Sequence, residues 1–248
     1  MTQHVSHRDI AAFAQRDGVF ANREIALVVK SQNQTERRKT MLASLKDGNL
    51  GRVEMRDISI GLLVRGRLED GVFVEHWRRE YREPRHIKRF GAHYLLTEVN
   101  RVIELDRDFE EVRSLRHPFF AFLHTVEVNR NASRILVTSS GYDRVIEFAA
   151  TPEGFRESWC WKGWQHGFNP DAKGLWVTDD EEERQRLEKQ GVPVRFVDPT
   201  RYGEQGLLTA ERTVHPNVAV YDPYDDENSI LVSCGAPGDI YRARYDSG

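Results

Sequence analysis

The chain has 248 residues, of which 39% are hydrophobic, 10% aromatic and 30% charged. This composition is typical of a folded globular chain and excludes an intrinsically disordered one. Lys and Arg number 36 against 39 Asp and Glu, a net charge of −3 at pH 7, which argues against a protein built to bind nucleic-acid backbones.

Further classes are excluded by what the sequence lacks. No apolar stretch reaches the roughly eighteen residues of a membrane-spanning helix, and the first residues (MTQHVSHRDIAAFAQ) lack the apolar core of a secretory signal. Cys160 and Cys234 are too few for a disulfide framework or a cysteine zinc site. We therefore expect a cytoplasmic protein with no membrane and no nucleic-acid partner. Several basic residues gather at 78–89, and we interpret most of them as part of a solvent-exposed face.

In chain order, an apolar strand, a short turn and a second strand recur five times. The units are 41–55 (MLASLKDGNLGRVEM), 94–105 (YLLTEVNRVIEL), 135–148 (ILVTSSGYDRVIEF), 175–198 and 230–245 (ILVSCGAPGDIYRARY). Their second strands align on Val53, Val102, Val145, Val194 and Ile240, at steps of 49, 43, 49 and 46 residues. Even spacing of this length is typical of repeat architectures.

Further extended stretches lie between the units at 72–81, 155–161 and 207–214, which brings each repeat to about four strands. This pattern predicts an all-β, five-bladed β-propeller of four-stranded antiparallel blades, with residues 1–248 forming one domain. We expect residues near 10–20 to supply the outer strand of the last blade. A sandwich or barrel is the alternative, but neither explains the even spacing.

The fourth blade is interrupted by a charged insertion at 179–191. Its acidic start, its lysine near the end and the glycine just after predict a short helix. Such a helix at the mouth of the channel is either a lid, a docking surface or a tolerated exposed insertion.

The passage HTVEVNRNASRILVTSSGYDRVIEF resembles the repeats of NHL, arylsulfotransferase-like and strictosidine-synthase-like propellers. It shares with them an opening histidine, the apolar strand ILVTSSG and the strand RVIEF. The resemblance extends over roughly residues 86–248 at the level of the superfamily. It implies a propeller fold and leaves the reaction open, and because those families usually have more blades, closure of the ring differs here.

Four histidines recur at the start of the first, innermost strand of successive units: His86, His124, His166 and His215. Because the innermost strands of a propeller line its central channel, we expect these imidazoles to form a ring there. Such a ring suits one divalent transition metal, with iron favoured and copper or zinc as alternatives. His93 and His117 could replace His86 and His124. Hydrogen bonding among the histidines, without a metal, is the structural alternative.

Carboxylates in the turns between second and third strands share the same face of the propeller. Glu98 and Asp143 are therefore candidate catalytic residues beside His124, either as proton carriers or as partners of the far histidine nitrogen. Trp164, just before His166, could form a wall of the pocket.

We therefore predict a metal-dependent oxygenase or oxidase acting on a small molecule, with an anionic substrate favoured by the uncompensated charge of the metal. Two alternatives remain open: a metal-free histidine-dependent transferase, hydrolase or lyase, and a non-enzymatic propeller that binds a protein or peptide on its top face. The sequence contains no GxGxxG, GxxxxGK[ST], GxSxG or HExxH motif, so nucleotide-fold, serine-hydrolase and zincin chemistries have no support. The oligomeric state is not predicted.

Overall fold

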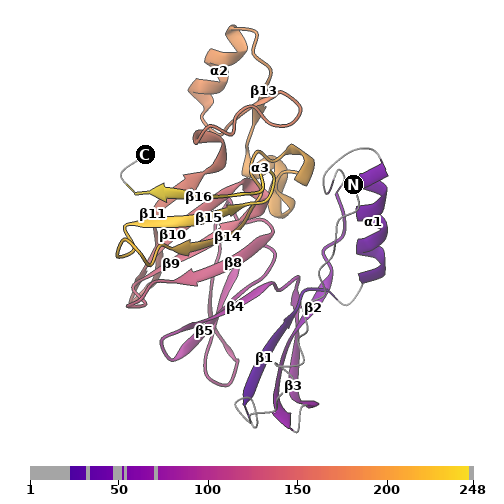
Figure 1. Cartoon of the computed structure of the whole chain (residues 1–248), viewed down its shortest axis with the longest axis vertical. Coiled ribbons are helices and arrows are strands. Elements are labelled where there is room, and N and C mark those ends of the chain that lie inside the picture. Colours follow the sequence, from indigo (N-terminus) through magenta and orange to yellow (C-terminus); the bar gives the residue numbers. More distant parts are fainter. Residues whose placement is uncertain (1–22, 32–33, 47–51, 53–54, 70–71, 246–248) are drawn as a thin grey trace, which may run out of the picture.

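The computed structural model describes residues 23–31, 34–46, 52, 55–69 and 72–245, and strands dominate them (Figure 1). Four antiparallel sheets follow one another along the chain. They comprise β1 (Glu24–Val29), β2 (Ile60–Glu69) and β3 (Val72–Arg82); β4 (His86–Phe90), β5 (His93–Thr97), β6 (Val102–Leu105) and β7 (Glu111–Leu115); β8 (Leu123–Val128), β9 (Arg134–Ser139), β10 (Arg144–Thr151) and β11 (Gly154–Lys162); and β14 (Pro216–Tyr221), β15 (Ser229–Cys234) and β16 (Asp239–Arg244).

The remaining elements are one parallel strand pair and short helices. The pair is β12 (Trp176–Thr178) with β13 (Val194–Phe196), and the helices are α1 (Gln34–Lys46), α2 (Glu181–Lys189), α3 (Pro199–Tyr202), η2 (Ser140–Tyr142), η3 (Gly163–Gln165), η4 (Gly203–Gln205) and η5 (Thr209–Glu211). No helix among the described residues is long and apolar enough to cross a bilayer.

The sheets pack face to face in chain order, and the alternation of side chains along each strand explains this. Leu95 packs toward the β8–β11 sheet in one apolar cluster, whereas its neighbour Leu96 packs toward Leu63 of the β1–β3 sheet in another. Leu136 likewise joins the cluster beneath β14–β16, while Ile135 faces the opposite sheet. Each middle sheet is therefore buried on both faces.

The innermost strands β4, β8 and β14 lie next to one another, with β8 in contact with both of the others. Radially stacked antiparallel meanders whose first strands meet along one axis are the blades of a propeller. The described part of the chain thus has the propeller architecture, whereas five blades and a closed ring stay predictions. The segment near 10–20, expected to complete the last blade, lies outside the described residues.

Three of the five predicted strand–turn–strand units are confirmed as antiparallel hairpins: β5–β6, β9–β10 and β15–β16. The extended stretches predicted at 72–81 and 155–161 are also confirmed, within β3 and β11. The stretch at 207–214 is not a strand, because η5 occupies its middle.

The first predicted unit is wrong, because residues 41–46 belong to helix α1. The alternation of residue types in MLASL predicts a strand, but the Leu, Ala, Lys and Arg residues of this segment favour a helix. The fourth unit is wrong as well. β12 and β13 are parallel, since helix α2 carries the chain back along its own length before β13 begins. The chain thus forms a short β–α–β insertion in place of a fourth blade.

The helix predicted within 179–191 is confirmed as α2. Asp180 is its N-cap and accepts the backbone N–H of Glu183 at 2.9 Å, and Gly191 adopts a φ of +74° just beyond its end. In Figure 1 the helix projects at the top of the view, away from the stacked sheets.

The insertion after β11 is anchored against the turn of the β9–β10 hairpin. Gly141 donates its N–H to Ala121 and accepts the N–H of Leu207, at 2.8 and 2.7 Å. A Cβ on Gly141 would lie 2.4 Å from the Cβ of Ala121. Close backbone approach at this point therefore requires glycine.

We predict that Gly141→Ala lowers the free energy of unfolding by about 1–3 kcal/mol through overpacking. Gly91→Ala is the control: Gly91 has a φ of +60° but nothing within 4 Å of an added Cβ, so only the backbone cost of about 1 kcal/mol applies. Urea denaturation of both variants measures the difference. Equal losses would contradict the close-packing argument.

Candidate functional site

The candidate site is the group of side chains gathered where the innermost strands β4, β8 and β14 begin. His86 begins β4, His124 is the second residue of β8 and His215 directly precedes β14, as predicted for three of the four histidines. Ladder irregularities follow the last two, between Leu123 and Val126 and between Pro216 and Val218. Such bulges redirect side chains at sheet ends and are frequent beside active sites.

Strained backbone marks the same positions. Glu83, Phe122 and His215 each lie just before an innermost strand, and they adopt left-handed φ values of +43°, +47° and +50°. This conformation costs a residue other than glycine about 1–3 kcal/mol, and such residues are frequent at functional sites. The same type of strain at equivalent points of three sheets indicates a selected arrangement of these side chains.

His124 and His215 meet edge to face, with ring centroids 5.6 Å apart. The guanidinium of Arg212 lies 3.0 Å from Nδ1 of His215. Because arginine can only donate, Nδ1 of His215 must accept, which places the imidazole proton on Nε2. His215 is thus a neutral hydrogen-bond donor through Nε2.

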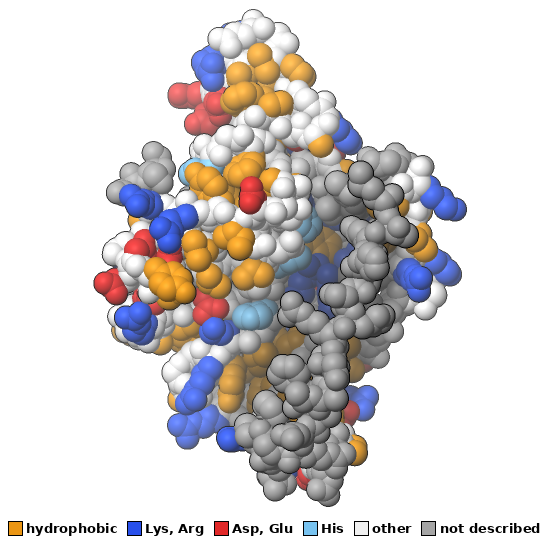
Figure 2. Space-filling model, viewed as in Figure 1, with side chains coloured by type: hydrophobic (Ala, Val, Ile, Leu, Met, Phe, Trp, Pro, Cys, Tyr) orange, Lys and Arg blue, Asp and Glu red, His pale blue; other side chains and the backbone are white. Residues whose placement is uncertain are grey.

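Basic side chains surround this histidine pair, and four guanidiniums converge on the ring of Phe122. Arg52, Arg56, Arg85 and Arg212 lie 4.6, 5.2, 5.5 and 6.0 Å from its centroid. We call these four arginines, with Lys30, the basic cluster. Figure 2 shows histidine and basic side chains gathered near the middle of the face in view.

Backbone carbonyls hold two of these guanidiniums in place. Arg212 donates to the carbonyl of Leu207 through Nε and Nη2, at 3.1 and 2.9 Å. Arg52 donates to the same carbonyl at 3.0 Å and to the side chain of Gln205 at 2.8 Å. These acceptors are neutral, so only nearby carboxylates offset the two positive charges: Asp143 and Glu211 for Arg212, and Glu83 and Glu211 for Arg52. Burial and the neighbouring cations outweigh them and lower the pKa of Arg212 to about 9 and that of Arg52 to about 10.

The same environment keeps both histidines neutral. Burial, followed by the charges of Arg212, Arg85, Lys30 and Arg52, lowers the pKa of His215 to about 3. Burial and Arg85 likewise hold the pKa of His124 well below its ordinary value. At neutral pH the site therefore combines two uncharged imidazoles with a strongly positive field.

Glu83 partly balances the cluster. It is fully buried, accepts the guanidinium of Arg56 and the hydroxyl of Ser59, and lies 3.5 Å from Arg85. Burial alone would raise its pKa, but the two arginines lower the pKa to about 2. Glu83 is therefore ionised and orients Arg56 and Arg85.

Asp143, a predicted catalytic residue, is buried and holds the chain that carries His215. It accepts the backbone N–H groups of Thr213, Val214 and His215, the last at 2.9 Å. Burial raises the pKa of Asp143, against the opposing pull of Arg212 and these donors. With its lone pairs used in this way, Asp143 positions His215 rather than contacting substrate.

Glu98, the other predicted catalytic carboxylate, is also engaged. Its oxygens accept the backbone N–H of Arg82 at 2.7 Å and the guanidinium of Arg101. It therefore fastens the end of β3 to the β5–β6 turn. His93 and His117 pair with Glu104 and Glu157 at 2.5 and 2.9 Å.

The structure does not bring the fourth predicted ligand to this group. His166 follows η3 and stacks on Trp161, with ring centroids 5.4 Å apart. Within the described ranges, no three His, Cys, Asp or Glu side chains form a group that could hold a metal ion. This placement differs from prediction because the fourth unit is not a blade.

The hydrogen bonds of the other histidines do not suit metal ligands either. A ligating imidazole normally donates its second N–H to an acceptor. Nδ1 of His215 instead accepts from Arg212, and Nδ1 of His86 accepts the N–H of Val126 at 3.4 Å. Both Nε2 atoms then carry protons and offer no lone pair. The predicted iron, copper or zinc ion finds no support in this arrangement, and no chemical step is built on it.

The basic cluster was missed by sequence reasoning. Arg85 was interpreted as part of a solvated face, yet only 9% of its side chain is exposed. One signal was present: Arg85 directly precedes His86, and Arg212 lies three residues before His215. Their closeness in sequence to these histidines indicates that the two arginines lie near the same strand starts.

The solved structures that resemble this chain include β-propellers. They include the β-propeller domain of Myceliophteria thermophila Cps50 (TM-score 0.45, 11% identity, 82% of this chain and 62% of that one). Others are the Neurospora crassa Pan2 WD40 domain (0.41, 8%, 79% and 46%) and a candidate 6-phosphogluconolactonase from Bacteroides uniformis (0.43, 10%, 91% and 65%). The chain spans less than two thirds of each. No known family and no curated protein matches the sequence.

We predict that the neutral histidines make stability fall as the pH drops. Unfolded histidine titrates near pH 6.5, whereas His215 in the folded protein titrates near 3. Between pH 6.5 and 5 the unfolded chain therefore binds protons that the folded chain does not. The free energy of unfolding should fall by up to about 1.4 kcal/mol per pH unit for each such histidine.

His215→Asn should make this decline shallower, because Asn tolerates the left-handed backbone and does not titrate. Urea denaturation between pH 7 and 5 measures it. The exposed His76→Asn is the matched control and should leave the slope unchanged. An unchanged slope in the His215 variant would contradict a neutral, buried imidazole.

Proposed function

We propose that the chain binds a small anionic molecule at the basic cluster and acts on it without a metal, His124 serving as general base. This is the metal-free histidine-dependent enzyme that the sequence left as an alternative. The observation that carries the proposal is the positive charge of the basic cluster. Four arginines and Lys30 lie around two neutral imidazoles, against the buried carboxylates Glu83 and Asp143.

An anion is the ligand that this arrangement favours. Guanidinium groups bind carboxylate, phosphate and sulfate through paired, charge-assisted hydrogen bonds. The closely spaced cations make the cluster costly when empty, because Arg56 lowers the pKa of Arg52 and Arg52 lowers that of Arg212. A bound anion relieves that repulsion, and Nε2–H of His215 adds a neutral donor.

The two histidines support different roles. His215 has its Nδ1 lone pair occupied by Arg212, so it can donate but cannot accept a proton. His124 has no such partner in the described hydrogen bonds, and burial and the nearby cations keep it neutral near pH 7. Those cations also oppose its protonation, but a bound anion offsets their charge and so makes the imidazole more basic. His124 can then take a proton from the bound substrate, while the arginines stabilise the negative charge that develops there.

Sulfate, which does not titrate between pH 5 and 8, is the probe that tests the binding site. We predict that Arg85→Gln weakens sulfate binding by about tenfold or more in calorimetric titration, since charged hydrogen bonds contribute about 1.5–3 kcal/mol. Arg78→Gln is the control, because Arg78 is an exposed arginine of β3 that pairs with Glu75 and does not belong to the basic cluster. Equal affinity in the two variants would refute the proposed site.

His124→Gln and His215→Asn separate binding from chemistry. We expect His215→Asn to weaken sulfate binding several-fold, because it removes the Nε2–H donor. His124→Gln should leave sulfate affinity within about twofold and abolish turnover of any substrate found, as expected for a base. Sulfate affinity that rises steeply below pH 6.5 in the wild-type protein would show that protonated imidazoles bind the anion, contrary to the proposal.

A further inference from the structure

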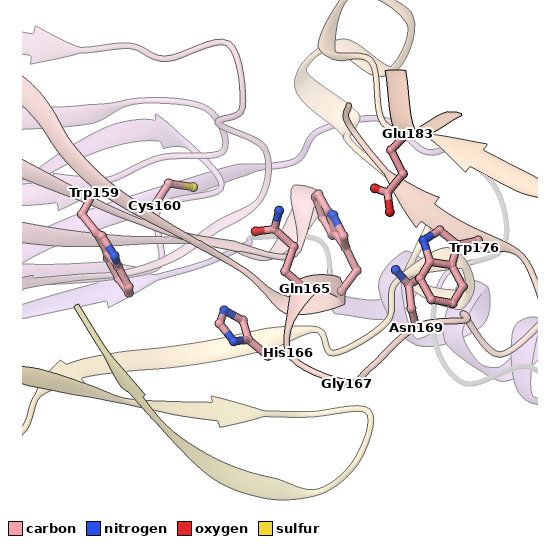
Figure 3. Close-up of a pocket in the computed structure, with 9 residues that line it drawn as sticks. Trp159, Cys160, Gln165, His166, Gly167, Asn169, Trp176 and Glu183 are labelled. Carbon is pink, nitrogen blue, oxygen red and sulfur yellow. The ribbon is translucent and has the colours of Figure 1, made fainter. Parts of the chain in front are cut away.

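A second hollow, distinct from the basic cluster, lies between β11, η3 and the β12–α2 insertion (Figure 3). Its volume is about 510 Å³, within the usual range for sites that bind small molecules. The side chains and backbone that line it are Trp159, Cys160, Trp164, Gln165, His166, Gly167, Asn169, Trp176 and Glu183. We call it the indole groove.

Aromatic rings form a large part of its walls, alongside polar groups. Three indoles reach it from three elements: Trp159 from β11, Trp164 from η3 and Trp176 from β12. In Figure 3, Trp159 and Trp176 lie toward opposite ends, with Gln165 and His166 between them. The groove is therefore elongated, and Trp164 is buried in its wall. The sequence predicted Trp164 for the wall of the central-channel pocket, which is a different site.

The lining holds one charged side chain. It includes no Lys or Arg, so a bound anion would find no cation there. Its one carboxylate, Glu183, accepts the hydroxyl of Thr178 at 2.6 Å and lies 3.6 Å from the guanidinium of Arg186, which partly offsets its charge. A bound cation would have to compete with Arg186 for this carboxylate. Burial lowers the pKa of His166, so this imidazole is uncharged near neutral pH.

The polar groups that a ligand could meet are few. The side chain of Asn169 is held by the backbone of Val177, to which it donates at 2.9 Å and from which it accepts at 2.7 Å. Within the described residues, neither the exposed amide of Gln165 nor the ring of His166 makes a side-chain hydrogen bond, and Nε1 of Trp164 is buried without a partner. Gln165 and His166 are neighbours in the chain, and together they can pair with one small polar edge of a ligand.

We propose that the indole groove binds an uncharged, planar aromatic group that carries a single amide-like edge. The ring would stack on or against the indoles, where aromatic pairs prefer offset or edge-to-face contact. The amide edge would pair with Gln165 and His166. His166 stacks on Trp161 with an interplanar angle of 11°, and this contact orients its ring in the groove.

Benzamide and cyclohexanecarboxamide test this directly, because they share the amide and nearly the same size and differ in aromaticity. We expect benzamide to bind about three- to tenfold more tightly by ligand-observed NMR titration, the gain of one to two aromatic contacts. Benzylammonium should bind more weakly than benzamide. Equal binding of the two amides, or a preference for benzylammonium or for methyl glucoside, would overturn the proposal.

Variants locate the binding. Trp176→Leu and Gln165→Ala should each weaken benzamide binding several-fold, whereas Trp77→Leu, which alters an indole in β3 packed on Phe109, should not. Circular dichroism confirms that each variant is folded, and an unfolded Trp176→Leu is replaced by Trp176→Phe. Loss of binding in the Trp77 variant, or retention in both groove variants, would place benzamide elsewhere and refute the groove.

Discussion

The hydrogen bond from Arg212 to Nδ1 of His215 is the interaction on which the rest of the site depends. A guanidinium buried to 5% exposure needs acceptors, and this one finds the Leu207 carbonyl and an imidazole lone pair. An imidazolium at that position would face the cation directly and leave it unsatisfied. The arginine thus fixes both the charge and the tautomer of the histidine. Under the proposed function, this arrangement favours a negatively charged ligand.

This arrangement requires strained backbone conformations next to the innermost strands. Phe122 and His215 adopt left-handed conformations before β8 and β14, and Asp143 accepts the N–H groups that keep the His215 segment in place. The stacked sheets provide the rigidity, because their shared apolar clusters fix the strands from which these residues project. Strain at the strand entrances is sustained by packing behind them.

The sequence predicted the sheets well where strands are local hairpins with an alternating pattern, as at 94–105, 135–148 and 230–245. It failed where a similar pattern belongs to another structure. Residues 41–46, predicted as a strand, form the end of helix α1, and the strands on either side of α2 pair in parallel instead of forming a hairpin. The recurrence of His86, His124 and His215 correctly placed three side chains at strand entrances. The roles of Asp143 and Glu98 could not be predicted, because their partners are backbone N–H groups and arginines that only the tertiary fold brings near. Arg85 and Arg212 could have been predicted from the sequence, because each precedes a histidine that the sequence identifies as a site residue.

Nitrogen-15 NMR of the imidazoles tests the central claim most directly, because the shifts of Nδ1 and Nε2 report both tautomer and charge. For His215 we predict a proton on Nε2, a bare Nδ1 and no change between pH 8 and 5. A proton on Nδ1, or titration near pH 6.5, would contradict the account of a neutral imidazole held by Arg212.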